Sequence, residues 1–363
     1  MKKNLSALGF MSGTSGDGVD TSVINSNGKD TINIKYNRFD PYPKELSKKI
    51  HIIKEKILGM QDLLKYSLEI RKLEQEITDF HADIAVKTYK EVDYELIGFH
   101  GHTIYHNADE KISKQIGLGA YLSEITNKTV VYDFRQNDIK DGGQGAPLSP
   151  IYHLALIKSL FNENKVKVPI SILNIGGIAN ITEIDKNFNI TSRDIGPGNC
   201  LIDMWIRKNS EKLYDENGDF AKKGKTDKII FNQYLDNYYY SKINSKRSLD
   251  TNDFDISFAK GLSLENGTTT ITDLTSELLS KKIGNYDTYI CGGGRKNKFL
   301  INSLKKKINN KIFTIDDLNI DGDYIESQAF AFLAIRSYFG LPTSYPSTTN
   351  CKKPTVGGTI IEK

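Results

Sequence analysis

The sequence predicts an α/β protein built from two related domains around a cleft, and three observations lead to this fold class. Three strand patterns joined by short turns open the chain between residues 5 and 36. A second group of three strand patterns recurs about 165 residues later, within residues 171–194. Helical patterns follow each group. Because no residue-level repeat accompanies this recurrence, the similarity is one of organisation, and it favours two domains of the same plan.

The first half of the chain begins as an antiparallel meander and then becomes helical. Strand patterns separated by short turns are typical of antiparallel pairing. An apolar stripe with spacings of four, three and four residues indicates a helix packed on the core and carries no sign of function. The elements expected here are strands at 5–11, 19–25 and 32–36, a helix carrying the stripe Leu73, Ile77, Phe80 and Ile84, a strand at 96–100, a helix at 119–126, a strand at 129–132 and a helix at 147–161.

The second half repeats the order of strands first and helices afterwards. Residues 354–361 lean toward strand and need a sheet, so we expect the C-terminal tail to pack back on the first domain. The N-terminal domain is then expected to comprise 1–130 with 345–363, and the C-terminal domain 131–344. The elements expected are strands at 171–177, 178–184 and 188–194, polar helices within 202–287 with a loop at 242–255, a strand at 287–294, helices at 297–308 and 325–339, and a strand at 359–361.

Composition and charge exclude several classes of protein. Hydrophobic residues make up 38% of the 363, enough for a sizeable core, and the net charge of +4 is spread along the chain. No basic stripe with interleaved aromatic residues occurs, so no nucleic-acid partner is expected. The sequence has no run near the roughly 20 apolar residues of a membrane span and no recognisable signal peptide. Cys200, Cys291 and Cys351 are too scattered for a disulfide framework or a zinc site, and the predicted location is the cytoplasm.

The stretch DIGPGN at 194–199 is the one around which the chain is organised. A strand-like run from Phe188 to Ser192 leads to Asp194, a Gly-Pro-Gly turn follows, and Asn199 is a candidate N-cap of the next helix. A carboxylate aimed at a cleft from this position is a reasonable general base. The alternative interpretation is a capped structural turn without chemistry.

The turn SGTSGDG at 12–18 joins two strand patterns and is the first candidate for binding phosphate. Its backbone N–H groups can form a concave nest for phosphate oxygens, and Ser12, Thr14 and Ser15 add hydroxyl donors. Asp17 can hold a hydrated Mg²⁺ that bridges phosphates, because Mg²⁺ prefers oxygen ligands and keeps several waters. The turn lacks the lysine of a Walker loop, and a plain hairpin turn is the alternative interpretation.

Two further glycine turns strengthen the case for a nucleotide. LNIGGIAN at 173–180 joins two strand patterns, and CGGG at 291–294 closes a strand and opens a helix. Bare glycine backbone can lie against a phosphate or the flat face of a base. No GxGxxG follows a strand, so a dinucleotide fold is excluded and a nucleotide held between two domains is favoured. The glycines concerned are Gly176, Gly177, Gly292, Gly293 and Gly294.

Residues 98–146 are rich in side chains that suit a polyhydroxylated sugar carrying an acid. Three histidines at 100, 102 and 106 suggest zinc, but no acid or cysteine has the matching ligand spacing, so a metal site is disfavoured. Arg135 suits a substrate carboxylate, with a surface ion pair as the alternative. Besides the histidines, the candidate sugar-binding side chains are Thr103, Arg135, Asp138 and Gln144.

From about residue 7 to its end, the chain resembles the anhydro-N-acetylmuramic acid kinase family, whose motifs occur here in the same order. GGQGAPL and the D-x-GPGN turn are quite specific to that family, whereas the glycine turns are shared more widely among sugar kinases. The matching segments are GFMSGTSGDGVD, GFHGHTIYH, VVYDFRQND, GGQGAPLSP, LNIGGIANIT, DIGPGNCLIDMW, CGGGRKN and IESQAFAFLA.

The resemblance implies a fold and a reaction. The fold is the two-domain actin-like ATPase architecture of sugar kinases, Hsp70 and actin, each domain a mixed sheet with helices, with Mg-ATP bound in the cleft between them. The reaction opens the 1,6-anhydro ring of anhydro-N-acetylmuramic acid with water and phosphorylates O6. Its product, N-acetylmuramic acid 6-phosphate, belongs to cell-wall recycling. The family also implies a homodimer.

The resemblance assigns roles residue by residue. Asp194 matches the catalytic base, and residues 13–20 match the ATP-phosphate loop. Glu326 opens a helical pattern and is expected to face the sugar or the attacking water, with a helix-start carboxylate favoured by the dipole as the alternative. The loop residues are Gly13, Thr14, Ser15, Gly16, Asp17, Gly18, Val19 and Asp20, and the expected substrate-binding residues are Thr103, Arg135, Gln144, Asn199 and Glu326.

Three positions depart from the family pattern. Gly16 stands where the family usually has leucine, and extra flexibility there is expected to loosen ATP binding. Phe99 and His102 replace serine and glutamine, and the charge of His102 is expected to vary near pH 6–7.

Two other functions fit the same sequence. A kinase for another amino sugar would use Asp194 to deprotonate a sugar hydroxyl, and its product would gain phosphate without water. A non-catalytic protein that senses sugar or ATP on the same fold would be expected to lack the acid after the second meander, but Asp194 is present.

Overall fold

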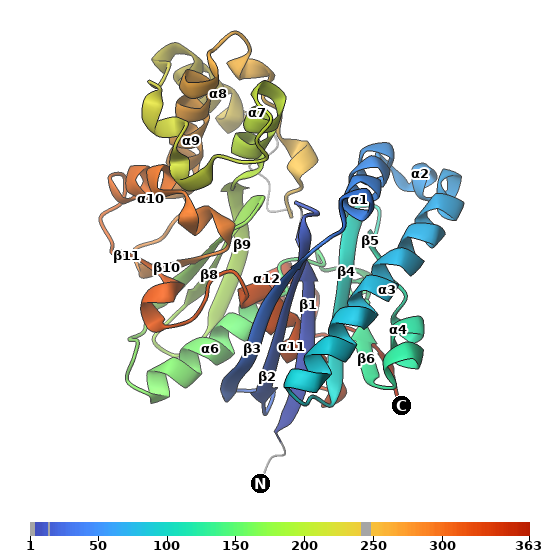
Figure 1. Cartoon of the computed structure of the whole chain (residues 1–363). Coiled ribbons are helices and arrows are strands. Elements are labelled where there is room, and N and C mark those ends of the chain that lie inside the picture. The colour runs from blue at the N-terminus through green and yellow to red at the C-terminus, as the bar shows by residue number, and fades with distance from the viewer. Residues whose placement is uncertain (1–3, 14, 241–247) are drawn as a thin grey trace. The chain divides into compact units, whose positions relative to one another are not determined.

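The computed structural model describes residues 4–13, 15–240 and 248–363, and it divides into two compact units. The first unit contains residues up to Lys167 together with Tyr324–Lys363, and the second contains Val168–Asp323. Each unit has one mixed sheet with helices packed on it, so the predicted α/β class is confirmed (Figure 1). Among the helices described, none combines the length and apolar character needed to cross a lipid bilayer.

The sheet of the first unit is built on the predicted meander. Its first three strands pair antiparallel with one another. The strand that starts at Leu96 lies between the first strand and the strand at 129–132 and pairs parallel with both. The spatial order is β12-β6-β4-β1-β2-β3, with β5 paired to β4 (Figure 1). The strands are β1 (Leu5–Ser12), β2 (Gly18–Ser26), β3 (Ile32–Pro41), β4 (Leu96–Asn107), β5 (Ile112–Ile116), β6 (Thr129–Tyr132) and β12 (Thr359–Ile361).

Helices cover both faces of this sheet. Phe10 of β1 points toward the buried apolar stripe, where its ring meets that of His81 edge-on at 5.0 Å. Gly9, on the opposite face, lies so close to another helix that a Cβ there would be 2.1 Å from the Ser327 carbonyl oxygen. The helices are α1 (Lys44–Lys56), α2 (Met60–Lys65), α3 (Ser67–Glu91), α4 (Gly119–Thr126), α5 (Gln136–Lys140), α6 (Pro150–Asn162), α11 (Ile325–Tyr338) and α12 (Pro346–Thr349).

This close packing explains why the unit boundaries differ from those expected at 130/131 and 344/345. Gly98 of β4 also allows α11 to pack closely against the sheet, because a Cβ at this position would lie only 2.3 Å from the Phe330 carbonyl oxygen. Helix α11 therefore belongs to the first unit, and α6, which packs against it, does as well. The segments 131–167 and 324–344 consequently join the N-terminal unit.

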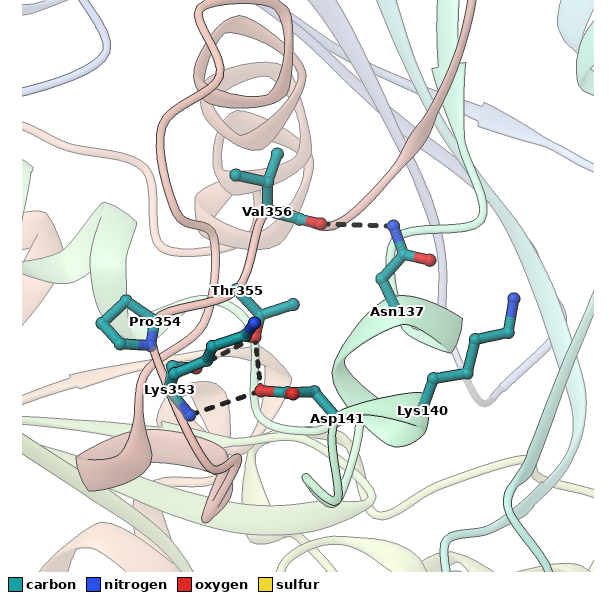
Figure 2. A pocket seen from close by; sticks show the side chains of 7 residues that line it. All are labelled: Asn137, Lys140, Asp141, Lys353, Pro354, Thr355 and Val356. Carbon is teal, nitrogen blue, oxygen red and sulfur yellow. Dashed lines mark hydrogen bonds between the residues drawn. The ribbon is translucent and has the colours of Figure 1, made fainter.

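The tail returns to the first unit as predicted, because β12 pairs antiparallel with β6. Helix α5 also holds the segment before β12 (Figure 2). The Asn137 amide donates to the Val356 carbonyl oxygen at 3.2 Å, and the Thr355 hydroxyl donates to Asp141 at 2.9 Å. A pocket of about 350 Å³ opens between these segments, lined by Asn137, Lys140, Asp141, Lys353, Pro354, Thr355 and Val356.

The second unit repeats the meander with a different helical cover. The spatial order of its sheet is β11-β10-β7-β8-β9, antiparallel over β7–β8–β9 and parallel elsewhere. Helices gather at one end of this sheet (Figure 1). The elements are β7 (Ile170–Ile175), β8 (Ile178–Ile184), β9 (Ile190–Pro197), β10 (Asp287–Cys291), β11 (Ile312–Thr314), α7 (Cys200–Asn209), α8 (Lys228–Tyr240), α9 (Leu264–Ser280) and α10 (Lys298–Lys305), with 3₁₀ turns at 216–218, 221–223, 251–253, 257–259, 293–296 and 315–318.

The expected polar helices of this region include one that is mostly buried. Helix α9 carries several threonines that have no exposed surface, among them Thr268 and Thr272. Their hydroxyls donate to helix carbonyl oxygens four residues earlier, at 2.6 and 2.7 Å. Each hydroxyl is therefore satisfied within the helix, and the methyl group packs as an apolar one. Of the loop expected at 242–255, residues 242–247 lie outside the described part of the chain.

Candidate active site

Asp194 lies on β9 of the second unit, and two donors fix its carboxylate. The backbone N–H of Leu249 donates to Oδ2 at 2.8 Å, and the Ser248 hydroxyl donates to the same oxygen at 3.2 Å. The strand continues to Pro197, so Asp194 lies within it, whereas the sequence predicted a strand at 188–194 that ends at Asp194. The side chain is half-buried, which keeps it within reach of a small molecule while its orientation is held.

Asp194 belongs to a row of residues that crosses four neighbouring strands. It pairs with Asn180 on β8, Asn180 pairs with Asn174 on β7, and Asn174 pairs with Cys291 on β10. Residues paired in this way lie on the same face of a sheet. The row therefore connects the candidate base to the turn that starts at Gly292 across three strand spacings, roughly 14 Å.

Two other glycine turns of the second unit, at 176–177 and 196–199, are bonded to each other. The N–H of Gly198 donates to Gly177 O at 2.9 Å, and the N–H of Asn199 donates to Gly176 O at 2.8 Å. A Cβ on Gly198 would lie 2.2 Å from the Gly176 carbonyl oxygen, so this close approach requires glycine. Asn199 is the N-cap residue of α7, but its side chain makes no cap bond and donates instead to Ile175 O at 3.5 Å.

The turn at 292–294 has two crowded glycines and one open one. A Cβ on Gly292, whose φ is +77°, would lie 2.3 Å from Asn174 Oδ1, and one on Gly294 would lie 2.2 Å from Ile175. Gly293 has no neighbour nearer than 3.9 Å to such an atom. The outer glycines are therefore needed for packing, while the backbone of Gly293 is open to an approaching group.

Arg295 anchors this turn from behind. Its guanidinium donates to Gly292 O at 3.2 Å and also binds three carboxylates, from Asp316 at 2.7 Å, Asp321 at 3.1 Å and Asp323 at 2.5 Å. Burial alone would lower the pKa of Arg295, but the hydrogen bonds that it donates to Asp316 and Asp323 raise the pKa above its usual value. The guanidinium is therefore always charged, and it ties the glycine turn to residues 316–323.

The candidate phosphate turn of the first unit is held from α1. Gly16 has φ of +61° and its N–H donates to Gly13 O at 3.1 Å. The Ser47 hydroxyl donates to the Gly16 carbonyl oxygen at 2.7 Å. A Cβ on Gly13 would meet nothing nearer than 4.0 Å, so its backbone is open. Thr14 lies outside the described residues.

Other members of this turn differ in how accessible they are. Asp17 is exposed and accepts a hydrogen bond from the Ser15 hydroxyl at 2.6 Å. Gly18, Val19 and Asp20 belong to β2 and not to the loop. The Val19 side chain has no exposed surface, so only its backbone can face a ligand.

Ser12 and His102 do not have the roles the sequence suggested. The Ser12 hydroxyl is buried, accepts from the Tyr42 hydroxyl at 3.0 Å and bonds His102 Nδ1 at 2.9 Å, so it faces inward and not toward a phosphate. Burial, with smaller contributions from Lys54 and His51, lowers the pKa of His102 to about 3. His102 is therefore neutral near pH 6–7, and its charge does not vary there.

Arg135 contacts His100 and the neighbouring loop. Its Nε and Nη2 donate to His100 Nε2 at 3.2 and 3.0 Å, and Nη1 donates to Gly145 O at 2.8 Å. Burial and then the Arg135 charge lower the pKa of His100 well below its usual value. A neutral His100 that accepts at Nε2 carries its proton on Nδ1, which donates to Gly101 O at 2.9 Å.

Among the other sugar-binding candidates, Asp138 has a structural role. Its buried carboxylate accepts from the Thr349 hydroxyl at 2.6 Å and from a loop N–H at 2.7 Å. Thr103 is half-buried and accepts from Gln115 at 3.1 Å. Gln144 is also half-buried and is placed by its backbone N–H, which donates to Thr349 O at 2.7 Å.

Glu326 lies in the first turn of α11 and is half-buried. His106, the third histidine considered for zinc, bonds the Ser113 hydroxyl at 2.8 Å. Within the described ranges, no group of three or more histidine, cysteine or acidic side chains is arranged to hold a metal ion. The candidate residues are thus divided: Gly13 and Ser15–Asp20, Thr103, Arg135, Gln144 and Glu326 lie in the first unit, and Asp194, Gly176, Gly177, Asn199 and Gly292–Gly294 in the second.

Comparisons with known proteins identify the family. A family model described as anhydro-N-acetylmuramic acid kinase matches residues 5–363. A protein of that name from Pelagibacter ubique is 46% identical over 100% of both chains. Another of that name from Agrobacterium fabrum is 36% identical over 98% of both. The chain belongs to the anhydro-N-acetylmuramic acid kinase family.

Solved structures similar to this family member are more distant in sequence. The activator of the 2-hydroxyisocaproyl-CoA dehydratase from Clostridium difficile, with bound ADPNP, is 12% identical, with 93% of this chain and 96% of that chain covered and a TM-score of 0.41. Glucokinase from Balamuthia mandrillaris, in complex with glucose, is 12% identical, with 92% and 94% covered and a TM-score of 0.37. What this member of the anhydro-N-acetylmuramic acid kinase family itself shows is an α/β fold with two mixed sheets.

Four residues near the site of this anhydro-N-acetylmuramic acid kinase family member were not assigned a role from the sequence. Asn174 and Asn180 sit in strands, where alternation with apolar neighbours gives no sign of chemistry. Ser248 is 54 residues from Asp194, which it contacts, so no local spacing connects them. Arg295 lies in the CGGGRKN motif, and its positive charge directly after three glycines could have indicated a role in holding that turn.

Proposed function

We propose that this protein is an ATP-dependent kinase that opens 1,6-anhydro-N-acetylmuramic acid with water and phosphorylates O6 in cell-wall recycling. The product is N-acetylmuramic acid 6-phosphate. The observation that carries the proposal is the Asp194 carboxylate, fixed by Leu249 and Ser248 and placed in one row with the Gly292 turn. Family membership supplies the substrate, and the carboxylate supplies the base that the reaction requires.

In this reaction Asp194 removes a proton from water as the water oxygen attacks the anomeric carbon. The C1–O bond to water forms while the C1–O6 bond breaks. The electron pair left on O6 attacks the γ-phosphorus, and the bond from that phosphorus to ADP breaks. A positioned base typically contributes 10²–10⁴-fold to such a rate. Phosphoryl transfer itself depends mainly on positioning and on neutralising charge.

Backbone glycines are the groups proposed to bind ATP. Gly13 and Gly293 have open space where a side chain would be, and Gly176 has no neighbour nearer than 3.6 Å, so a phosphate or base can approach their backbone closely. Mg²⁺ neutralises phosphate charge when bound, and the exposed carboxylate of Asp17 fits a hydrated ion of this kind. The full proposed set is Gly13, Thr14, Ser15, Gly16, Asp17, Gly18, Val19, Asp20, Gly176, Gly177, Gly292, Gly293 and Gly294.

Five half-buried residues are proposed to bind the sugar. Half-burial leaves polar atoms accessible while neighbouring contacts keep the side chain in place. Arg135 already donates to His100 and Gly145, so its contact with a substrate carboxylate rests on the family pattern. The five are Thr103, Arg135, Gln144, Asn199 and Glu326.

The test is a mass-resolved assay with Mg-ATP and 1,6-anhydro-N-acetylmuramic acid in normal and ¹⁸O-labelled water. The expected product carries one phosphate and one heavy oxygen at C1. Phosphorylation of N-acetylmuramic acid or another amino sugar, with none of the anhydro sugar, would instead identify an ordinary kinase. ATP and sugar binding without any turnover would identify a sensing protein.

The assembly and location follow from the same proposal. A homodimer and a cytoplasmic location are proposed on the family resemblance, with a small-molecule substrate and without nucleic acid or membrane as partner. Light scattering on the purified chain measures the assembly: a mass near twice 40.9 kDa supports the dimer, and a mass near 40.9 kDa contradicts it.

A further inference from the structure

His100 of β4 holds the guanidinium of Arg135 along one of its edges. Arg135 Nε and Nη2 lie 3.2 and 3.0 Å from His100 Nε2. Because arginine can only donate, this nitrogen is the acceptor and the imidazole is neutral. Arg135 Nη1 donates to the Gly145 carbonyl oxygen at 2.8 Å. Both acceptors are uncharged, so they orient the guanidinium without cancelling its positive charge.

The His100 ring is itself fixed on several sides. The residue is 4% exposed, and its Nδ1 donates to the Gly101 carbonyl oxygen at 2.9 Å. Gly101 has φ of +73°, and a Cβ there would lie 2.4 Å from the Ile116 carbonyl oxygen, so it packs closely against β5. On another side the ring of Phe330 lies 4.4 Å away, centroid to centroid, at an interplanar angle of 34°. The acceptor nitrogen therefore has a set position and direction.

The second acceptor of Arg135 belongs to a loop that is held equally well. The Gly145 N–H donates to Asp138 Oδ2 at 2.7 Å, and the Thr349 hydroxyl donates to Oδ1 of the same carboxylate at 2.6 Å. The N–H of Gln144 donates to the Thr349 carbonyl oxygen at 2.7 Å. Arg135 is thus bonded to the loop that carries Gln144, another of the residues proposed to bind the sugar.

Helix α11 approaches the same histidine. Phe330, which contacts the His100 ring, lies one helical turn after Glu326. Residues four apart in a helix lie on the same side of it, so His100 faces the side of α11 that carries Glu326. Three of the proposed sugar-binding residues, Arg135, Gln144 and Glu326, therefore come from segments that meet around His100.

We propose that His100 is the positioning residue that presents Arg135 to the substrate carboxylate and so makes the enzyme prefer the sugar acid to the same sugar without its acid. This inference rests on the proposed function and adds how the acid is selected. Arginine binds a carboxylate through parallel N–H bonds, which require the guanidinium plane to be fixed. A carboxylate in place of His100 would form an ion pair with Arg135 and compete with the substrate.

The experiment compares two sugars, because a merely structural contact would affect both alike. The first is 1,6-anhydro-N-acetylmuramic acid, and the second is 1,6-anhydro-N-acetylglucosamine, which has the same anhydro ring but no lactyl carboxylate. The wild-type enzyme is expected to prefer the acid about 10- to 100-fold in kcat/KM. His100→Leu should lose most of this preference through a higher KM for the acid, while the KM for ATP and kcat/KM for the neutral sugar stay nearly unchanged.

Two further variants serve as controls. His100→Gln retains an acceptor oxygen and should restore most of the preference for the acid. His153→Leu removes a buried histidine of α6 in the same unit, and it should keep the preference even where Tm falls. The proposal is overturned if His100→Leu keeps the wild-type preference, if His100→Gln is no better than His100→Leu, or if His153→Leu loses the preference to the same extent.

A double-mutant cycle tests whether His100 acts through Arg135. Arg135→Leu should abolish the preference for the acid, and adding His100→Leu to it should reduce the preference no further. If the two losses add, His100 acts by another route and the proposal is wrong.

The wild-type enzyme distinguishes this failure from that of the proposed function. If it incorporates ¹⁸O from water and prefers the acid, but the variants behave otherwise than expected, only the role of His100 is wrong. If it opens both anhydro sugars equally well, the contact of Arg135 with the carboxylate is wrong and the inference fails with it, while the reaction stands. If it phosphorylates only an open amino sugar, the proposed function and the inference both fail.

Discussion

The two units share a three-stranded meander but differ in where their polar chemistry lies. In the first unit, polar groups of the turn after β1 are bonded by the protein, as when Ser47 donates to the Gly16 carbonyl oxygen. In the second unit the corresponding turn contains two glycines, and the polar side chains lie along the strands in the row from Asp194 to Asn174. The same topology thus provides a backbone cradle in one unit and a face of side chains in the other.

The histidines divide even more sharply between the units. All six lie in the first unit, and none in the second. Several are buried and have a lowered pKa, so they are neutral at neutral pH. The units are therefore expected to respond differently to acid, to the loss of a carboxylate and to the loss of a glycine, and four predictions test that comparison.

Replacing the base should give the largest effect. Asp194→Asn keeps the shape of the side chain and its acceptor oxygen but cannot take a proton, so turnover is expected to fall about 10²–10⁴-fold with nearly intact ATP binding. Steady-state kinetics and nucleotide titration measure the two separately. The control is Asp236→Asn, an exposed acid on α8. Near-normal turnover in Asp194→Asn would show that Asp194 is not the general base.

Removing the guanidinium of Arg295, which holds the glycine turn at 292–294, should lower the stability of the second unit. Arg295→Ala leaves three carboxylates facing one another, and we expect a loss of about 2–3 kcal/mol of unfolding free energy, less than for a fully buried pair because those carboxylates are partly exposed. Lys296→Ala removes an exposed neighbour and should change stability by less than about 1 kcal/mol. Denaturant unfolding compares them, and equal effects would contradict the anchoring role of Arg295.

The glycines of the two units should differ in their tolerance of a methyl group. Gly198→Ala places a Cβ 2.2 Å from a carbonyl oxygen, so we expect a loss of about 1–3 kcal/mol of stability. Gly13→Ala meets nothing nearer than 4.0 Å and should leave stability unchanged while raising the KM for ATP. Chemical denaturation and ATP kinetics of both variants check this, and a destabilised Gly13→Ala would mean that the first turn is packed like the second.

Acid should weaken the first unit selectively. Burial lowers the pKa of His81 to about 4, of His102 to about 3 and of His153 to about 3. The unfolded chain takes up these protons below about pH 6.5 and the folded chain does not, so stability falls as pH falls from about 6.5 toward 4. Each histidine contributes at most about 1.4 kcal/mol per pH unit in that window, because the slope is largest midway between its unfolded and folded pKa values.

Hydrogen exchange resolved by peptide, at pH 7 and pH 5 and corrected for the intrinsic rate, measures this difference. First-unit peptides should lose protection, and second-unit peptides should lose less. His102→Gln removes one such proton uptake and should flatten the dependence. Equal loss in both units, or no change in His102→Gln, would count against the histidines as the cause.

The fold was predictable where local pattern decides structure. Both meanders, the stripe on α3 and the return of the tail as β12 are confirmed, because alternation and helical spacing reflect which faces are buried. Helix α1 was missed although Leu46, Ile50 and Ile53 have helical spacing. The boundaries of the units depended on α11 packing at Gly9 and Gly98, a contact between distant segments that no local pattern contains.

The candidate site was predictable to a similar extent. Motifs of particular residue types made Asp194 and the glycine turns candidates, and their roles stay predictions. The donors that hold Asp194 come from Ser248 and Leu249, far along the chain. The neutral state of His102 depends on its complete burial by surrounding elements, which the sequence around it does not reveal.

The buried threonines of α9 have a consequence for how this chain is built. The hydroxyls of Thr268, Thr269, Thr270 and Thr272 donate to the backbone of their own helix, so a threonine at such a position can occupy the interior much as valine does. The hydrophobic share of 38% therefore understates the material available for the core. Such a chain can contain more polar residues than its core volume suggests and still exclude water from the core. Estimates of its stability from composition alone will therefore be too low.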